Sequence, residues 1–131
     1  MRAVVEGLAA RLAARHAAPE EQALLRRLVE DSRRMTHDAE ALRDNNRRFH
    51  RQLHLASHNR YLNTMLDGIR RSMALLTLTS LADPTRGVET VDEHDAIARA
   101  VEARDEDAAD AAARLHISRA YETRLKLDAE R

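Results

Sequence analysis

The sequence has no cysteine among its 131 residues. Disulfide bonds and thiolate metal ligands are therefore excluded, and a metal site would have to use His, Asn, Asp or Glu. The absence of cysteine also fits a reducing compartment, so we expect a cytoplasmic protein.

Residues that interrupt helices are scarce as well, with two prolines and three glycines. The chain is instead rich in Ala, Leu, Arg and Glu, the residues that lose least on entering a helix. An apolar content of 44% is enough to fill one core. The sequence predicts a single all-α domain over residues 1–131.

Net charge and aromatic content exclude two classes of partner. Lys+Arg and Asp+Glu are equal at 22 each, so no overall field attracts nucleic acid or an acidic membrane. Two tyrosines and one phenylalanine offer little for base stacking. No apolar run approaches the roughly 18 residues that span a bilayer, and the start does not resemble a signal peptide. We expect no membrane partner, and we interpret the arginine runs as solvated helix faces.

Apolar periodicity and start signals predict four helices in the first part of the chain. The first ends near residues 16–18, and Pro19 opens the second. Asp38 can cap a third that runs to about Ser57, and the fourth extends over about 61–80. The side chains expected to face inward are Val5, Leu8, Leu12, Leu24, Leu25, Leu28, Met35, Leu42, Phe49, Leu53, Ala56, Tyr61, Leu62, Met65, Leu66, Ile69, Met73 and Leu76.

Two more helices are expected after a loop over 82–87. Thr90 and Glu93 have the spacing of a capping box, which would start the fifth helix. Asp105 can cap the sixth. The expected inner faces of these two helices are Val91, His94, Ile97, Ala98 and Val101, then Ala108, Ala112, Leu115, His116 and Tyr121.

The most informative pattern is Asn46-x-x-Phe49-His50, followed by single histidines at 94 and 116 on later amphipathic segments. Asn46 and His50 are four residues apart, so on one helix they point the same way. His94 and His116 from other helices could complete a four-point metal shell. The alternative for each histidine is a hydrogen-bonded place in an apolar core.

Spacing alone leaves the part played by His54 open. It lies one turn beyond His50, and a His-x-x-x-His pair on a helix is itself a metal-binding geometry. His16, at a helix end, and His37, in a polar turn, are interpreted as surface residues.

Several short motifs, in this order and spacing, resemble the FCD domain, the effector-binding C-terminal domain of FadR-type regulators within the GntR family. The resemblance covers essentially the whole chain. The motifs are Arg2-x-x-Val5-Glu6-x-x-Ala9-Ala10-x-Leu12-Ala13-Ala14, Asn46-x-x-Phe49-His50, Ala56-Ser57-x-Asn59, Glu93-His94-x-x-Ile97-x-x-Ala100-Val101, Asp105-x-x-x-Ala109 and His116-Ile117.

The resemblance implies an antiparallel bundle of six or seven helices with a metal at its centre. By matching position, the ligands would be Asn46, His50, His94 and His116. The metal would be Zn, or Ni, Mn, Co or Fe, and His54 would support a ligand or pack beside it. The family more often has Asp at position 46, so the neutral amide of Asn46 should weaken metal binding and favour an anionic effector.

The resemblance also implies a small carboxylate bound over the metal. Arg2 matches an arginine of the first helix that points into the effector cavity, where it could grip a carboxylate at two points. The alternative is that Arg2 only pairs with Glu6 one turn along. Thr90, one turn before His94, could offer its hydroxyl to the effector.

The predicted function is therefore that of a ligand-sensing domain of a transcriptional regulator, acting as a homodimer and not as an enzyme. Whole regulators of this type bind DNA through a winged helix-turn-helix module, which we do not find in this chain. One alternative is a metal-dependent hydrolase or oxygenase. It lacks support because the helix faces around the three histidines offer mainly Ala, Ile and Leu rather than a general base. Another is a structural dimerisation bundle without a metal.

Overall fold

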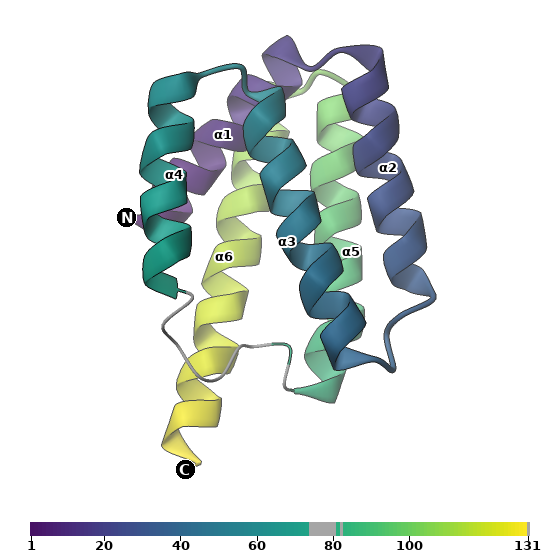
Figure 1. Cartoon of the computed structure of the whole chain (residues 1–131), viewed down its shortest axis with the longest axis vertical. Coiled ribbons are helices and arrows are strands. Elements are labelled where there is room, and N and C mark those ends of the chain that lie inside the picture. Colours follow the sequence, from purple (N-terminus) through teal and green to yellow (C-terminus); the bar gives the residue numbers. More distant parts are fainter. Residues whose placement is uncertain (74–80, 82, 131) are drawn as a thin grey trace.

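The computed structural model describes residues 1–73, 81 and 83–130. This part of the chain contains six helices and no strand, which confirms the all-α class (Figure 1). The helices are α1 (Arg2–His16), α2 (Pro19–Arg33), α3 (Ala39–Ala56), α4 (Arg60–Met73), α5 (Pro84–Glu102) and α6 (Glu106–Ala129).

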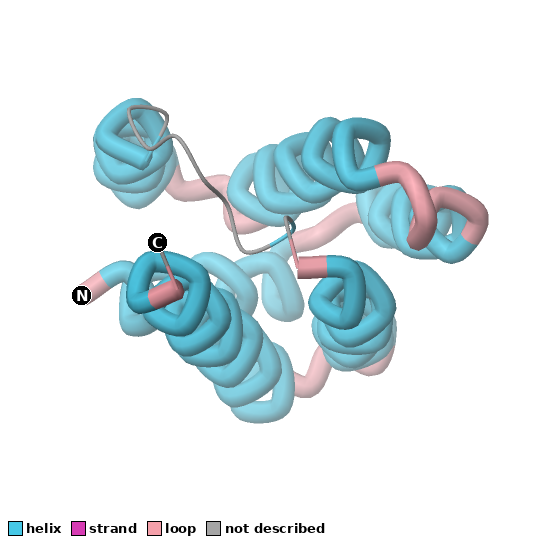
Figure 2. Tube along the Cα trace, turned by 90° about the horizontal axis from the view of Figure 1, so that it is seen from below, coloured by secondary structure: helices cyan, strands magenta, loops and turns pink. Residues whose placement is uncertain are grey.

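The six helices form two layers. Helices α2, α3 and α4 lie on one side, and α1, α5 and α6 lie on the other (Figure 2). The most extensive contact joins α1 to α6, while α2 and α3 connect the layers by packing on α5 and α1. Helix α4 lies at one edge of the bundle (Figure 1) and contacts α1 and α3. None of the helices described is long and apolar enough to cross a membrane.

Small side chains fill the interface of α1 with its neighbours. Ala10, Ala13 and Ala14 are fully buried, and Ala109 and Ala113 are buried on the facing helix α6. Because alanine projects only a methyl group, the two backbones can approach closely. The larger core residues come from the other helices, including Leu25 and Val29 of α2 and Phe49 and Leu53 of α3.

The expected starts of three helices are confirmed. Pro19 occupies the first turn of α2. The side chains of Asp38 and Asp105 each accept a backbone N–H, from Ala41 and Ala108 respectively, at 3.1 Å. Each aspartate thus satisfies one of the N–H groups that lack a partner within the helix.

The expected loop over 82–87 and the capping box at Thr90 are wrong. Helix α5 begins at Pro84, and Asp83 caps it by accepting the N–H of Thr85 at 3.0 Å. Thr90 is therefore an interior helix residue. An Asp-Pro pair is both a turn signal and a good helix start, and here the helix is formed. Gly87 then lies on a buried face, where a Cβ would come within 2.9 Å of Leu42.

Several inward positions were also assigned to the wrong face. Leu8 and Leu24 are exposed, as are Tyr61 and Met65 of α4. On α6 the buried residues are Ala109, Ala113, His116 and Ile117, so Ala108, Leu115 and Tyr121 are instead exposed and Ala112 is half-buried. In alanine-rich helices the apolar stripe is broad, and the leucines do not mark its centre. Leu76 and the expected end of α4 near Ser80 fall outside the described residues, as does the side chain of Met73.

A tight turn within one layer ties α1 to its neighbours. Between α5 and α6, Arg104 adopts a left-handed conformation with φ 56°. Its guanidinium donates to the carbonyls of Ala14, Arg15 and Ala17 at 3.2, 3.3 and 2.6 Å. These carbonyls lie at the C-terminal end of α1, where helix carbonyls lack partners.

Ala13→Leu is expected to destabilise the protein by about 1–3 kcal/mol, because the added atoms must enter a packed interface. Urea unfolding measures the change. The matched control is Ala111→Leu on the exposed side of α6, which should stay within about 0.5 kcal/mol of the wild type. Equal stability of the two variants would show that α1 does not pack as described.

Candidate metal centre

Three histidines from three helices converge in the centre of the bundle. Nε2 of His116 on α6 lies 3.1 Å from Nε2 of His50 on α3 and 3.3 Å from Nε2 of His94 on α5. The three ligand nitrogens all lie within 4.8 Å of one another. Residues that are 66 and 22 positions apart in the chain thus present the same ring nitrogen to one point.

This spacing suits a bound cation. Metal–imidazole bonds of about 2.0–2.1 Å at tetrahedral angles place neighbouring nitrogens about 3.3 Å apart. Neutral imidazole is a good ligand for Zn, Ni, Co, Mn or Fe. His94 and His116 are buried and His50 is nearly so, which limits competition from water. The three histidines therefore fit a metal with little rearrangement.

Each ring is held by its surroundings. His94 stacks on Phe49 with ring centroids 4.1 Å apart. Nδ1 of His116 lies 2.7 Å from Oε1 of Glu93. When Nδ1–H donates this hydrogen bond to the carboxylate, Nε2 of His116 carries a free lone pair, as a metal ligand requires.

Glu93 is itself held by a buried arginine. Arg86, 1% exposed, donates to both carboxylate oxygens of Glu93, with Nη1 2.6 Å from Oε2. Burial raises the pKa of the Glu93 carboxyl, but His116 and Arg86 outweigh it and hold the pKa at about 2. Glu93 is thus ionised at neutral pH, and Arg86 balances its charge.

A second carboxylate lies on the other side of the cluster. Glu6 of α1 is 3% exposed and accepts from Nε2 of His54 at 2.8 Å. The same oxygen, Oε2, lies 3.6 Å from Nδ1 of His50, which has no hydrogen-bond partner in the described structure. Glu6, His50 and His54 form a further group close enough to hold an ion.

His50 and His94 are kept neutral, as metal ligands must be. Burial lowers the pKa of His50 to about 4, although the neighbouring Glu6 opposes the shift. Burial also holds the pKa of His94 well below 6.5, and His116 and His50 add to the effect. At neutral pH both rings are uncharged, so a metal need not displace their protons to bind.

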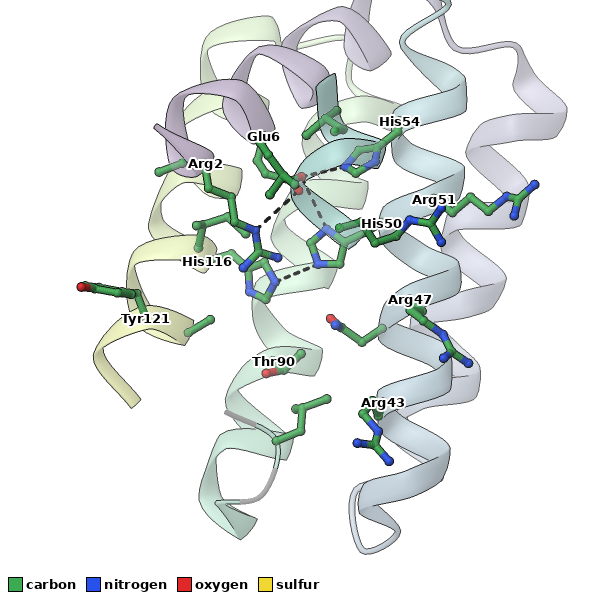
Figure 3. Close-up of a pocket in the computed structure, with 18 of the residues that line it drawn as sticks. Arg2, Glu6, Arg43, Arg47, His50, Arg51, His54, Thr90, His116 and Tyr121 are labelled. Carbon is green, nitrogen blue, oxygen red and sulfur yellow. Dashed lines mark hydrogen bonds and ion pairs between the residues drawn. The ribbon is translucent and has the colours of Figure 1, made fainter. Parts of the chain in front are cut away.

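A cavity of about 1100 Å³ opens from this cluster between the two layers (Figure 3). Asn46, His50 and His116 all line it, as do Arg2 and Thr90. Asn46 is half-buried one turn before His50. His94 is not among the lining residues and lies behind the other two histidines.

The cavity wall carries more arginine than acid among the described residues. The lining arginines are Arg2, Arg43, Arg47, Arg51, Arg70 and Arg124, and the lining acids are Glu6, Glu40, Asp44 and Asp67. Nε of Arg2 lies 4.0 Å from Oε1 of Glu6. The ion pair with Glu6, which is the alternative expected for Arg2, is therefore present as a long contact. Arg2 nevertheless lines the cavity.

Sequence reasoning missed three residues of the site. Arg86 falls in the expected loop and Glu93 in the expected capping box, while Glu6 is the alternative partner of Arg2. Glu6 and Glu93 are otherwise only positions of the family motifs, with no part in the site. The expectation that apolar side chains surround the histidines was wrong, because two carboxylates lie beside them. The sequence does contain one signal. Glu93 directly precedes the expected ligand His94, so its carboxylate could be expected near the metal site, where a ligand histidine such as His116 needs a hydrogen-bond acceptor for its second ring nitrogen.

The FCD domain model matches residues 1–119. The chain belongs to the FCD domain family. Similar solved structures include a GntR of Streptococcus agalactiae, with 25% identity over 89% of this chain and a TM-score of 0.74. Another is McbR/YncC of E. coli, with 20% identity over 92% of this chain and a TM-score of 0.75. No curated protein matches the sequence significantly.

This FCD chain spans 53% and 61% of the lengths of those two solved chains. FCD domains of GntR-type regulators are effector-binding, non-enzymatic regulatory domains, and they often bind a metal. The family resemblance stated from the sequence is thereby confirmed.

Metal-free protein should lose stability as the pH falls from 6.5 towards 4. The unfolded chain takes up a proton on His50 at about pH 6.5, whereas the folded state does so only at about 4. His50 alone then accounts for about 2 kcal/mol between pH 7 and pH 5. Urea unfolding in the presence of chelator measures this, and His50→Gln should flatten the dependence. An unchanged slope in that variant would place the acid sensitivity elsewhere.

Proposed function

We propose that this FCD domain senses a small organic acid through a divalent metal held by Asn46, His50, His94 and His116. The observation that carries the proposal is the convergence of three imidazole Nε2 atoms, with separations of 3.1 and 3.3 Å. Zn, with its preference for imidazole and tetrahedral geometry, suits the donors well, and Ni, Co, Mn and Fe are chemically compatible.

Asn46 supplies the fourth donor in this proposal. It precedes His50 by just over one turn of α3 and lines the same cavity. An amide oxygen is a weaker ligand than a carboxylate and leaves the charge of the cation less neutralised. The metal face that opens to the cavity is then strongly attractive to an anion.

Arg2 and Thr90 are the proposed protein contacts of that anion. Both line the cavity, from α1 and α5 respectively. A guanidinium can donate two parallel hydrogen bonds to a carboxylate while another effector oxygen approaches the metal. Thr90 is 4% exposed, and its hydroxyl would add a directional hydrogen bond to the anion.

We propose a regulatory mechanism rather than turnover. The two carboxylates beside the cluster are engaged, Glu93 by Arg86 and His116, and Glu6 by His54. Because both carboxylates already accept hydrogen bonds, a role as general base is disfavoured for either. The effector would instead favour one packing of α1 against α3 and α5. In a cytoplasmic homodimer, that change of packing would alter the positions of the attached winged helix-turn-helix modules.

The purified protein should contain close to one divalent transition metal per chain. His50→Ala, His94→Ala and His116→Ala should each abolish tight binding, because each removes one of the converging nitrogens. His54→Ala is the matched control from the same helix as His50, and it should lose at most about 100-fold in affinity. Elemental analysis and chelator competition measure both quantities. Metal-free protein that takes up no added Zn²⁺ or Co²⁺ would refute the proposal.

Hydroxy acids, dicarboxylates or sugar acids should raise the melting temperature of the metal-loaded protein. Arg2→Ala should remove most of that gain and leave the metal in place, because a charge-assisted contact of about 1.5–3 kcal/mol is lost. Arg15→Ala, on the same helix but outside the cavity, is the control. A response of Arg2→Ala equal to that of the wild type would exclude Arg2 from the anion site.

A further inference from the structure

Two buried carboxylates stand behind the histidine cluster, one on each side. Glu93 lies behind His116, and Glu6 lies behind His50. The proposed donor set of three imidazoles and one amide contains no negative charge. Any charge that the protein itself supplies to balance a divalent cation must therefore come from groups that do not touch it.

The two carboxylates differ in how far their charge is already balanced. Glu93 receives two hydrogen bonds from the guanidinium of Arg86, which is 1% exposed. Glu6 has no such partner, since its nearest guanidinium, that of Arg2, is 4.0 Å away on a side chain that is 34% exposed. Glu6 is therefore the carboxylate whose charge remains available to the metal.

The orientation of His50 points to the same residue. Its Nε2 faces His116, and its Nδ1 is buried without a hydrogen-bond partner in the described structure. When Nε2 binds a metal, the ring proton must reside on Nδ1. The atom that faces this proton is Oε2 of Glu6, 3.6 Å away (Figure 3). A small shift of either side chain closes that gap to a hydrogen bond.

Two other described features of the molecule do not indicate a binding site. The ion pairs of Arg26 with Asp95 and Glu102 join α2 to α5 on a partly exposed surface. The exposed Tyr61 and Met65 on α4 form an apolar face with no indication of what covers it.

Resting on the proposed metal function, we propose that Glu6 is a positioning residue for the metal. It orients His50 with Nε2 towards the cation, and it supplies from α1 the negative charge that Asn46 does not. His54 holds the carboxylate in place through its 2.8 Å hydrogen bond. The first helix thereby takes part in metal binding without contributing a ligand.

The test is a charge exchange between positions 6 and 46. Glu6→Gln keeps the size of the side chain and removes its charge, and it should weaken Zn²⁺ and Co²⁺ binding about 10–100-fold. Adding Asn46→Asp to that variant should recover most of the affinity, because a carboxylate is restored next to the metal. Chelator competition measures the affinities. The d–d spectrum of bound Co²⁺ should keep the same coordination number in the wild type and Glu6→Gln.

Two controls keep the test specific. Glu40→Gln removes an exposed acid from the wall of the same cavity and should leave metal affinity unchanged. Glu6→Asp retains the charge and should bind metal more tightly than Glu6→Gln, which keeps the proposal testable if Glu6→Gln unfolds.

Four results would overturn the proposal. The first is a metal affinity of Glu6→Gln equal to that of the wild type, and the second is no recovery of metal affinity in the double variant. The third is an equal loss of metal affinity in Glu6→Gln and Glu6→Asp. The fourth is a wild-type chain that binds two ions, one of which is lost when Glu6 is replaced. In the last case Glu6, His50 and His54 form a second ion site and Glu6 is a ligand. A wild-type protein that binds no metal would instead refute the proposed function itself.

Discussion

The close approach of α1 to its neighbours is the constraint on which the rest of the structure depends. Alanines at 10, 13 and 14 of α1 and at 109 and 113 of α6 let the backbones come together. This packing carries the N-terminal part of α1 over the histidine cluster, so that Glu6 reaches both His50 and His54. With larger residues at these positions, α1 would stand farther out and its acid would not reach α3.

The centre of the bundle is polar, and burial and hydrogen bonding set the protonation states of its ionisable groups. Two imidazoles are kept neutral by burial, while two carboxylates remain ionised because each receives hydrogen bonds. Buried groups of this kind are costly unless they are paired, and most of them are paired here. Two atoms of the cluster, Nδ1 of His50 and Nε of Arg86, are buried without a hydrogen-bond partner in the described structure, and the first of them faces Glu6.

The helical class and three of the helix starts could be predicted from the sequence, because these depend on local chemistry. Asn46 and His50 share a helix face, so four-residue spacing was enough to pair them. The convergence of His94 and His116 depends on how α5 and α6 pack, so the pattern of histidines could suggest it only as one of two alternatives, and the family resemblance favoured it. Glu6, Arg86 and Glu93 were missed because charged residues are usually exposed, and burial of an ion pair depends on tertiary packing. The buried face of α1 was misjudged because its alanines, rather than its leucines, make the contacts.

The two ends of α1 are held by different kinds of contact. At the end away from the cavity, Arg104 of the turn between α5 and α6 donates to the carbonyls of Ala14 and Ala17. At the end beside the cavity, the buried carboxylate of Glu6 accepts from His54. The same helix therefore connects the turn after α5 with the wall of the cavity.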